Sequence, residues 1–127
     1  MNIFIYMKTL FFMNRKTYLT KMSRVRFHGI KALSKLVEVK YWGLNWDGYN
    51  PNLTVQENID TLPDKYDVAI AYKPLELKNF KDLNIPKCIR YNEMFDIKWT
   101  MKEIRESGVQ LVICHHLNDC ERYQRDA

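Results

Sequence analysis

Short runs of apolar residues alternate with amphipathic stretches along the chain. Such runs, when rich in β-branched residues, are typical of strands that are covered on both faces of a parallel sheet. We expect five strands, over residues 9–13, 37–42, 66–72, 86–91 and 109–114. The last run is followed directly by His115 and His116, so two imidazoles stand where a buried strand ends.

The stretches between these runs carry helix signals. From about residue 18 to residue 35, apolar residues recur every three or four positions, which predicts an amphipathic helix. Thr54-x-x-Glu57 matches the capping box of a short helix that ends before Pro63, and Thr100-x-x-Glu103 that of a helix that ends before Gly108. Asn118, three residues before Glu121, predicts the cap of a final helix.

Strand and helix therefore alternate, with short connections between them. This pattern predicts an α/β fold with a Rossmann-like open parallel sheet of about five strands and helices on both faces. A length of 127 residues indicates a single domain over residues 1–127, with residues 1–8 as a candidate extension. No run approaches the ~20 apolar residues that span a bilayer, and residues 1–13 lack the flanks of a signal peptide.

The net charge of +5 is unevenly distributed. Residues 1–40 hold nine Lys and Arg against one Glu, whereas residues 41–127 hold eleven against fourteen Asp and Glu. A basic helical face over residues 18–35 is ordinarily a solvated face, but it also suits docking on an anionic membrane surface, with nucleic acid as the less favoured partner. The face consists of Lys21, Arg24, His28, Lys31 and Lys35.

Polar and aromatic residues gather where the predicted strands end. Because the carboxyl ends of parallel strands meet at one edge of the sheet, we expect a shared ligand cleft there. Aromatic rings, carboxylates and amides suit a polyhydroxylated ligand, and histidine is the usual acid or base near neutral pH. The expected members are Trp46, Asp47, Tyr49, Lys73, Glu76, Arg90, Asn92, Glu93, His115, His116 and Asn118.

Several common cofactor and metal sites are disfavoured. The chain has neither a G-x-G-x-x-G loop nor a P-loop, so we expect no dinucleotide or P-loop cofactor. Cys114, His115, His116 and Cys120 have no second Cys/His pair to complete a zinc site, and we expect no metal. The three cysteines lack a disulfide-framework spacing, which favours reduced thiols and a cytoplasmic location.

Four segments of the chain carry a family resemblance in their order and spacing. They are Trp42-Gly-x-x-Trp-Asp-Gly-Tyr-Asn-Pro, Tyr66-Asp-Val-x-Ile-Ala-Tyr-Lys-Pro, Ile89-Arg-Tyr-Asn-Glu-Met-Phe-Asp and Val112-Ile-Cys-His-His. With these segments the chain resembles the N-terminal half of the GT-B glycosyltransferases, in which two Rossmann-like domains face each other and a nucleotide-sugar is the donor.

The resemblance implies that this half binds a glycan or lipid acceptor, while a second domain or chain holds the nucleotide-sugar. It also implies that His116 or His115 contacts the reacting sugar. Asp47, Asn92 and Glu93 would then orient hydroxyl groups, and Trp46 and Tyr49 would serve as platforms. The glycine-rich first loop of this family is absent, and so is the donor domain, so we expect a truncated enzyme that is inactive alone.

A second hypothesis is a non-catalytic binding module of flavodoxin-like shape. Such a module would dock on a partner through its basic first helix and would not need the two histidines. The two hypotheses differ in where the binding energy lies, at the carboxyl ends of the strands or on the basic helix.

Overall fold

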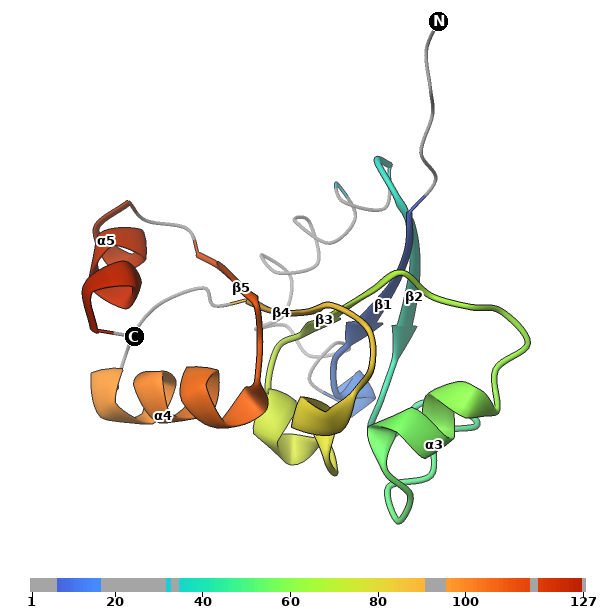
Figure 1. Cartoon of the computed structure of the whole chain (residues 1–127). Coiled ribbons are helices and arrows are strands. Elements are labelled where there is room, and N and C mark those ends of the chain that lie inside the picture. The colour runs from blue at the N-terminus through green and yellow to red at the C-terminus, as the bar shows by residue number, and fades with distance from the viewer. Residues whose placement is uncertain (1–6, 17–31, 33–34, 91–95, 115–116, 127) are drawn as a thin grey trace, which may run out of the picture.

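The chain folds around a single sheet in the computed structural model, which describes residues 7–16, 32, 35–90, 96–114 and 117–126. The elements within these residues are two short 3-10 turns, three helices and five strands (Figure 1). In chain order they are β1 (Lys8–Phe12), β2 (Glu38–Trp42), α3 (Val55–Asp60), β3 (Val68–Ala71), η2 (Pro74–Glu76), η3 (Phe80–Asp82), β4 (Lys87–Arg90), α4 (Ile97–Ser107), β5 (Leu111–Ile113) and α5 (Leu117–Asp126).

All five strands are parallel, in the order β2-β1-β3-β4-β5. This arrangement confirms the predicted α/β class and Rossmann-like open sheet, and the order is that of flavodoxin-like sheets. β1 pairs with β2 on one side and with β3 on the other. The direction in which the sheet grows therefore reverses at β1, which makes the gap between the ends of β1 and β3 the topological switch point.

Side chains of successive strand residues point to opposite faces of the sheet. Leu10 and Phe12 of β1 belong to one buried cluster, together with Trp42 and Ala71 of the neighbouring strands. Phe11, between them, belongs to a second cluster on the other face, with Met13, Ile70 and Cys88 among its members. Both faces of the central strands are buried, which explains why their sequences read as continuous apolar runs.

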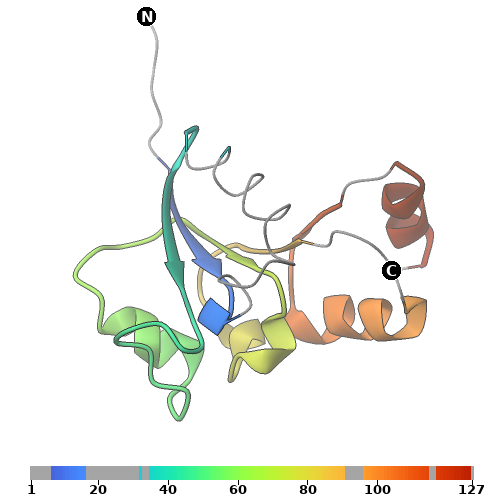
Figure 2. The same cartoon turned by 180° about the vertical axis from the view of Figure 1, so that it is seen from behind.

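The helices and turns between β2 and β5 cover the face of Leu10 and Phe12. Val55 of α3 and Phe80 of η3 pack against these side chains, and Met101 of α4 packs on Ile89 of β4. Figures 1 and 2 show α3, the two turns and α4 along this face, with α5 beside the β5 edge. The helix predicted over residues 18–35 lies almost entirely outside the described residues.

Two of the predicted helix ends are confirmed. The Thr54 hydroxyl accepts a hydrogen bond from the Glu57 backbone N–H at 3.1 Å, and the Glu57 carboxylate accepts one from the Thr54 N–H at 3.2 Å, as in a capping box. Gly108 ends α4 with a φ of 67°, a left-handed conformation that glycine adopts without steric cost.

Two predicted helix starts are wrong. α4 begins one turn before Thr100, because the Asp96 carboxylate caps it by accepting a hydrogen bond from the Trp99 N–H at 3.1 Å. Thr100 and Glu103 are therefore buried inside the helix. α5 begins at Leu117, so Asn118 lies in its first turn and not at its cap.

The part of the chain from β3 to β5 differs from the prediction in two features. β3 and β4 are connected by the 3-10 turns η2 and η3 instead of a helix. The prediction that the last strand is covered on both faces is wrong, because β5 is a three-residue edge strand whose Leu111 and Ile113 are exposed. No helix among the described residues has the length and apolar character that crossing a membrane requires.

The side chain of Asn58 in α3 stabilises the loop that follows β2 through hydrogen bonds. Its side chain is buried, accepts a hydrogen bond from the Asn50 N–H at 2.8 Å, and donates to the carbonyls of Asn50 at 2.8 Å and Thr54 at 3.0 Å. One amide side chain thus satisfies three backbone groups of an irregular segment.

We expect Asn58→Ala to lower the free energy of unfolding by about 2 kcal/mol, because the buried amide is removed and the Asn50 N–H loses its acceptor. The Asn50 and Thr54 carbonyls keep their backbone donors, the N–H groups of Leu53 and residue 58. Asn52→Ala, at an exposed neighbouring position, is the matched control and should change stability by no more than about 0.5 kcal/mol. Urea unfolding followed by circular dichroism measures both values. Equal effects of the two substitutions would contradict the anchoring role of Asn58.

Candidate functional site

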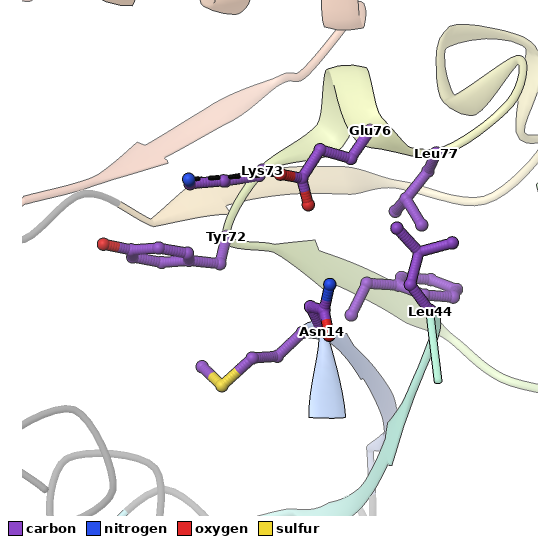
Figure 3. Close-up of a pocket in the computed structure, with 8 residues that line it drawn as sticks. Asn14, Leu44, Tyr72, Lys73, Glu76 and Leu77 are labelled. Carbon is purple, nitrogen blue, oxygen red and sulfur yellow. Dashed lines mark ion pairs between the residues drawn. The ribbon is translucent and has the colours of Figure 1, made fainter. Parts of the chain in front are cut away.

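A crevice lies at the switch point, where β1, β2 and β3 end. Backbone hydrogen bonds tie the three exits together, from Met13 N–H to the Trp42 carbonyl at 3.0 Å and from Tyr72 N–H to the Phe12 carbonyl at 3.2 Å. We call this site the switch-point crevice (Figure 3). It is lined by Phe12, Met13, Asn14, Leu44, Tyr72, Lys73, Glu76 and Leu77.

The crevice has an apolar floor and a polar rim. Phe12 and Leu77 are buried core residues, and Leu44 packs against them. On the rim, the Lys73 ammonium lies 3.9 Å from the Glu76 carboxylate, and both side chains are largely exposed. The enclosed space is about 20 Å³, room for one or two water-sized groups. This shape suits a polar group of a ligand that lies across the rim, such as a hydroxyl or a phosphate oxygen.

Asn14 completes the rim from the β1 side. Its side-chain oxygen accepts hydrogen bonds from the Lys16 N–H at 3.0 Å and from the Asn45 amide at 2.8 Å. Figure 3 shows the Asn14 side chain and the Glu76 carboxylate facing each other, while Tyr72 and Lys73 extend together in another direction. The ends of β1 and β3 therefore each supply hydrogen-bonding groups to one opening.

The aromatic residues of the loop after β2 brace that loop against the sheet. The Trp46 indole N–H donates to the Met13 carbonyl at 2.6 Å, and its ring stacks on Tyr41 at 6.4 Å between centroids. The Arg15 guanidinium lies 5.8 Å from the same ring. Trp42 donates to the Asp47 carbonyl at 3.1 Å. These contacts fix the loop that carries Leu44 to the crevice.

Tyr49 packs its ring edge to face against Trp42, with 5.1 Å between centroids, and lies near Phe12. Burial raises the pKa of Tyr49 to about 12. The ring predicted to be a sugar platform thus packs on the core. The substrate-binding roles of Trp46, Asp47 and Tyr49 stay predictions.

The other predicted site residues divide into two groups. Lys73 and Glu76 line the switch-point crevice, and Arg90 ends β4, partly buried. Asn92, Glu93, His115 and His116 lie outside the described residues, as does the side chain of Asn118, so their roles stay predictions. Within the part of the chain that the structure describes, no three His, Cys, Asp or Glu side chains gather as a metal site would require.

The sequence interpretation missed Asn14, Leu44 and Tyr72 as members of the site. The strand ends that carry them were identified, but the sheet order was not. Once β1 is known to lie between β2 and β3, the residues that directly follow these three strands become the expected lining.

Comparisons of this chain with protein-family models, with curated proteins and with solved structures give no match. The residues themselves therefore carry the functional interpretation.

The raised pKa of Tyr49 predicts a loss of stability at alkaline pH. An unfolded tyrosine ionises near pH 10, whereas the folded one holds its proton to about pH 12, so this contribution is intact below pH 10 and is lost between pH 10 and 12. Tyr49→Phe should remove this part of the pH dependence and one phenolate titration with a midpoint near 12. Denaturant unfolding of both proteins measures the pH dependence of stability, and ultraviolet titration measures the phenolate midpoint. If both proteins lose stability equally between pH 10 and 12, the raised pKa of Tyr49 is contradicted.

Proposed function

We propose that this chain is the acceptor-side half of a GT-B-like glycosyltransferase that uses a nucleotide-sugar, and that its switch-point crevice contacts the sugar ligands. The observation that supports this proposal best is that Asn14, Lys73 and Glu76 line one crevice with an apolar floor at the switch point of a Rossmann-like sheet. Open α/β sheets bind their ligands at this place.

The chemistry of the rim suits a polyhydroxylated or phosphorylated ligand. The Lys73 ammonium donates up to three hydrogen bonds and neutralises a phosphate, and the Glu76 carboxylate accepts from sugar hydroxyls. Leu44, which is only partly buried, offers apolar contact to the C–H face of a sugar ring. The proposal assigns these groups to binding and orientation.

Catalysis would require groups beyond the crevice. In this proposal, His116 or His115 serves the reacting sugar, and Asp47, Asn92 and Glu93 orient its hydroxyls. Arg90 and Asn118 would complete the edge. In this proposal a second Rossmann-like domain holds the nucleotide-sugar, as in the GT-B glycosyltransferases that the chain resembles.

The second candidate is a flavodoxin-like binding module that docks on anionic membranes. The strand order β2-β1-β3-β4-β5 fits the shape of such a module, since it is the flavodoxin-like order. The exposed Lys35 is the described member of the basic stripe Lys21, Arg24, Lys31 and Lys35, which would make the contact. In this case the crevice would have no ligand.

The proposed glycosyltransferase function predicts that sugar ligands bind at the switch-point crevice. In NMR titrations with uridine diphosphate sugars and short glycans, we expect amide shifts at Asn14, Tyr72 and Lys73. Lys73→Met should weaken binding about tenfold or more, because a charge-assisted hydrogen bond contributes about 1.5–3 kcal/mol. Lys65→Met is the matched control, since Lys65 is an exposed lysine that precedes β3 at the opposite edge. The absence of shifts around the crevice would refute the proposal.

Binding to anionic vesicles distinguishes the two candidate functions. If the chain is a membrane-docking module, the double variant Lys31→Glu with Lys35→Glu should weaken sedimentation with phosphatidylserine vesicles at least tenfold, because each basic residue contributes about 1 kcal/mol. Salt should weaken this binding steeply, and His116→Ala should leave it unchanged. For the glycosyltransferase half, the double variant should retain sugar binding, and phosphatidylcholine vesicles serve as the control surface.

A further inference from the structure

Two cysteine side chains meet beside the β5 edge of the sheet. The Cys114 and Cys120 sulfur atoms lie 2.6 Å apart, one directly after β5 and the other in the first turns of α5. This distance is only about half an ångström longer than an S–S bond. Both side chains are half-buried, so small reagents can reach them.

We propose that Cys114 and Cys120 form a reversible intramolecular disulfide. The fold holds the two thiols in contact, and an oxidant needs to move them only slightly. The bond would close a ring from residue 114 to residue 120, and such a short ring restricts the unfolded chain less than a long one does. A modest gain in stability suits a bond that cytoplasmic reductants can reverse.

The third cysteine, Cys88, lies in a different environment from Cys114 and Cys120. Cys88 lies in β4, is 8% exposed and packs in the core with Ile70 and Met13. Burial raises the pKa of this thiol, which leaves little thiolate for reaction at neutral pH. The redox chemistry should therefore be confined to the Cys114–Cys120 pair.

Oxidised glutathione is a sufficient oxidant. One cysteine thiolate of the pair attacks a sulfur of the glutathione disulfide, breaks its S–S bond and releases one glutathione thiolate. The second cysteine thiolate then attacks the mixed disulfide, forms the Cys114–Cys120 bond and releases the other glutathione. The protein loses two protons and two electrons, and two glutathione thiols are produced from one disulfide.

The ring encloses residues 115–119, which include His115 and His116. Disulfide formation would therefore restrain the chain at the end of β5, on the same edge of the sheet as the switch-point crevice. Any effect on sugar binding rests on the proposed function, whereas formation of the bond does not.

Peptide mapping tests the bond directly. The full chain is equilibrated in glutathione redox buffer, its remaining thiols are alkylated, and trypsin releases residues 106–122, which contain both cysteines and no internal cleavage site. We expect this peptide to be unalkylated and lighter by two hydrogen atoms, while Cys88 reacts after unfolding. Added dithiothreitol should restore both thiols.

Repeating the equilibration in urea measures how much the folded structure favours formation of the disulfide. We expect the equilibrium constant for the bond to be at least tenfold larger in the native protein, because the structure holds the sulfurs together. Cys120→Ser should abolish the modified peptide and Cys88→Ala should leave it unchanged. Equal constants in both conditions, bonds between chains, or two free thiols in the native peptide would each overturn the proposal. Sugar titrations play no part in this test, so its failure is distinct from that of the proposed function.

Discussion

The pairing of β1 with a parallel strand on each side is the constraint on which the rest of the structure depends. Its backbone is hydrogen-bonded to β2 and to β3, and its side chains enter both cores, Phe12 on one face and Phe11 on the other. A chain leaving such a strand must emerge between its two neighbours. The position of Asn14 beside Lys73 and Glu76 is therefore a consequence of the sheet order, and so is the crevice between them.

The aromatic residues around the loop after β2 have a structural role that the sequence pattern did not indicate. Trp46 and Trp42 both use their indole N–H groups on backbone carbonyls, and Tyr49 packs edge-on against Trp42. Asn58 holds the far end of the same loop. Trp42 and Asn58 thus satisfy backbone groups of this irregular segment, Trp46 ties it to the end of β1, and Tyr49 packs it on the core. Together these contacts stabilise the position of Leu44 in the crevice.

Features encoded by neighbouring residues were predictable from the sequence. The five strands, the Thr54 capping box and the Gly108 terminus follow from local patterns, and each is present. The start of α4 was wrong because a competing cap, Asp96, lies one turn before Thr100, which is buried. The start of α5 was wrong because the helix begins at Leu117, before the predicted cap. The strand order, the bonds of Asn58 and the meeting of Cys114 with Cys120 depend on contacts between elements, which local patterns do not encode. The predicted lining of the crevice was incomplete for the same reason.

The hydrogen bonds that join the strand exits have a consequence for molecular recognition. Met13, Tyr72 and Arg15 donate to Trp42, Phe12 and Leu44, so the floor of the crevice belongs to the same cooperative unit as the central sheet. Opening the floor would require breaking the ladder, and native-state hydrogen exchange would proceed there only through near-global unfolding. A ligand that binds this floor meets a preorganised surface and loses little binding energy to ordering the protein, so the selectivity of this floor is set by the shape already present in the free protein.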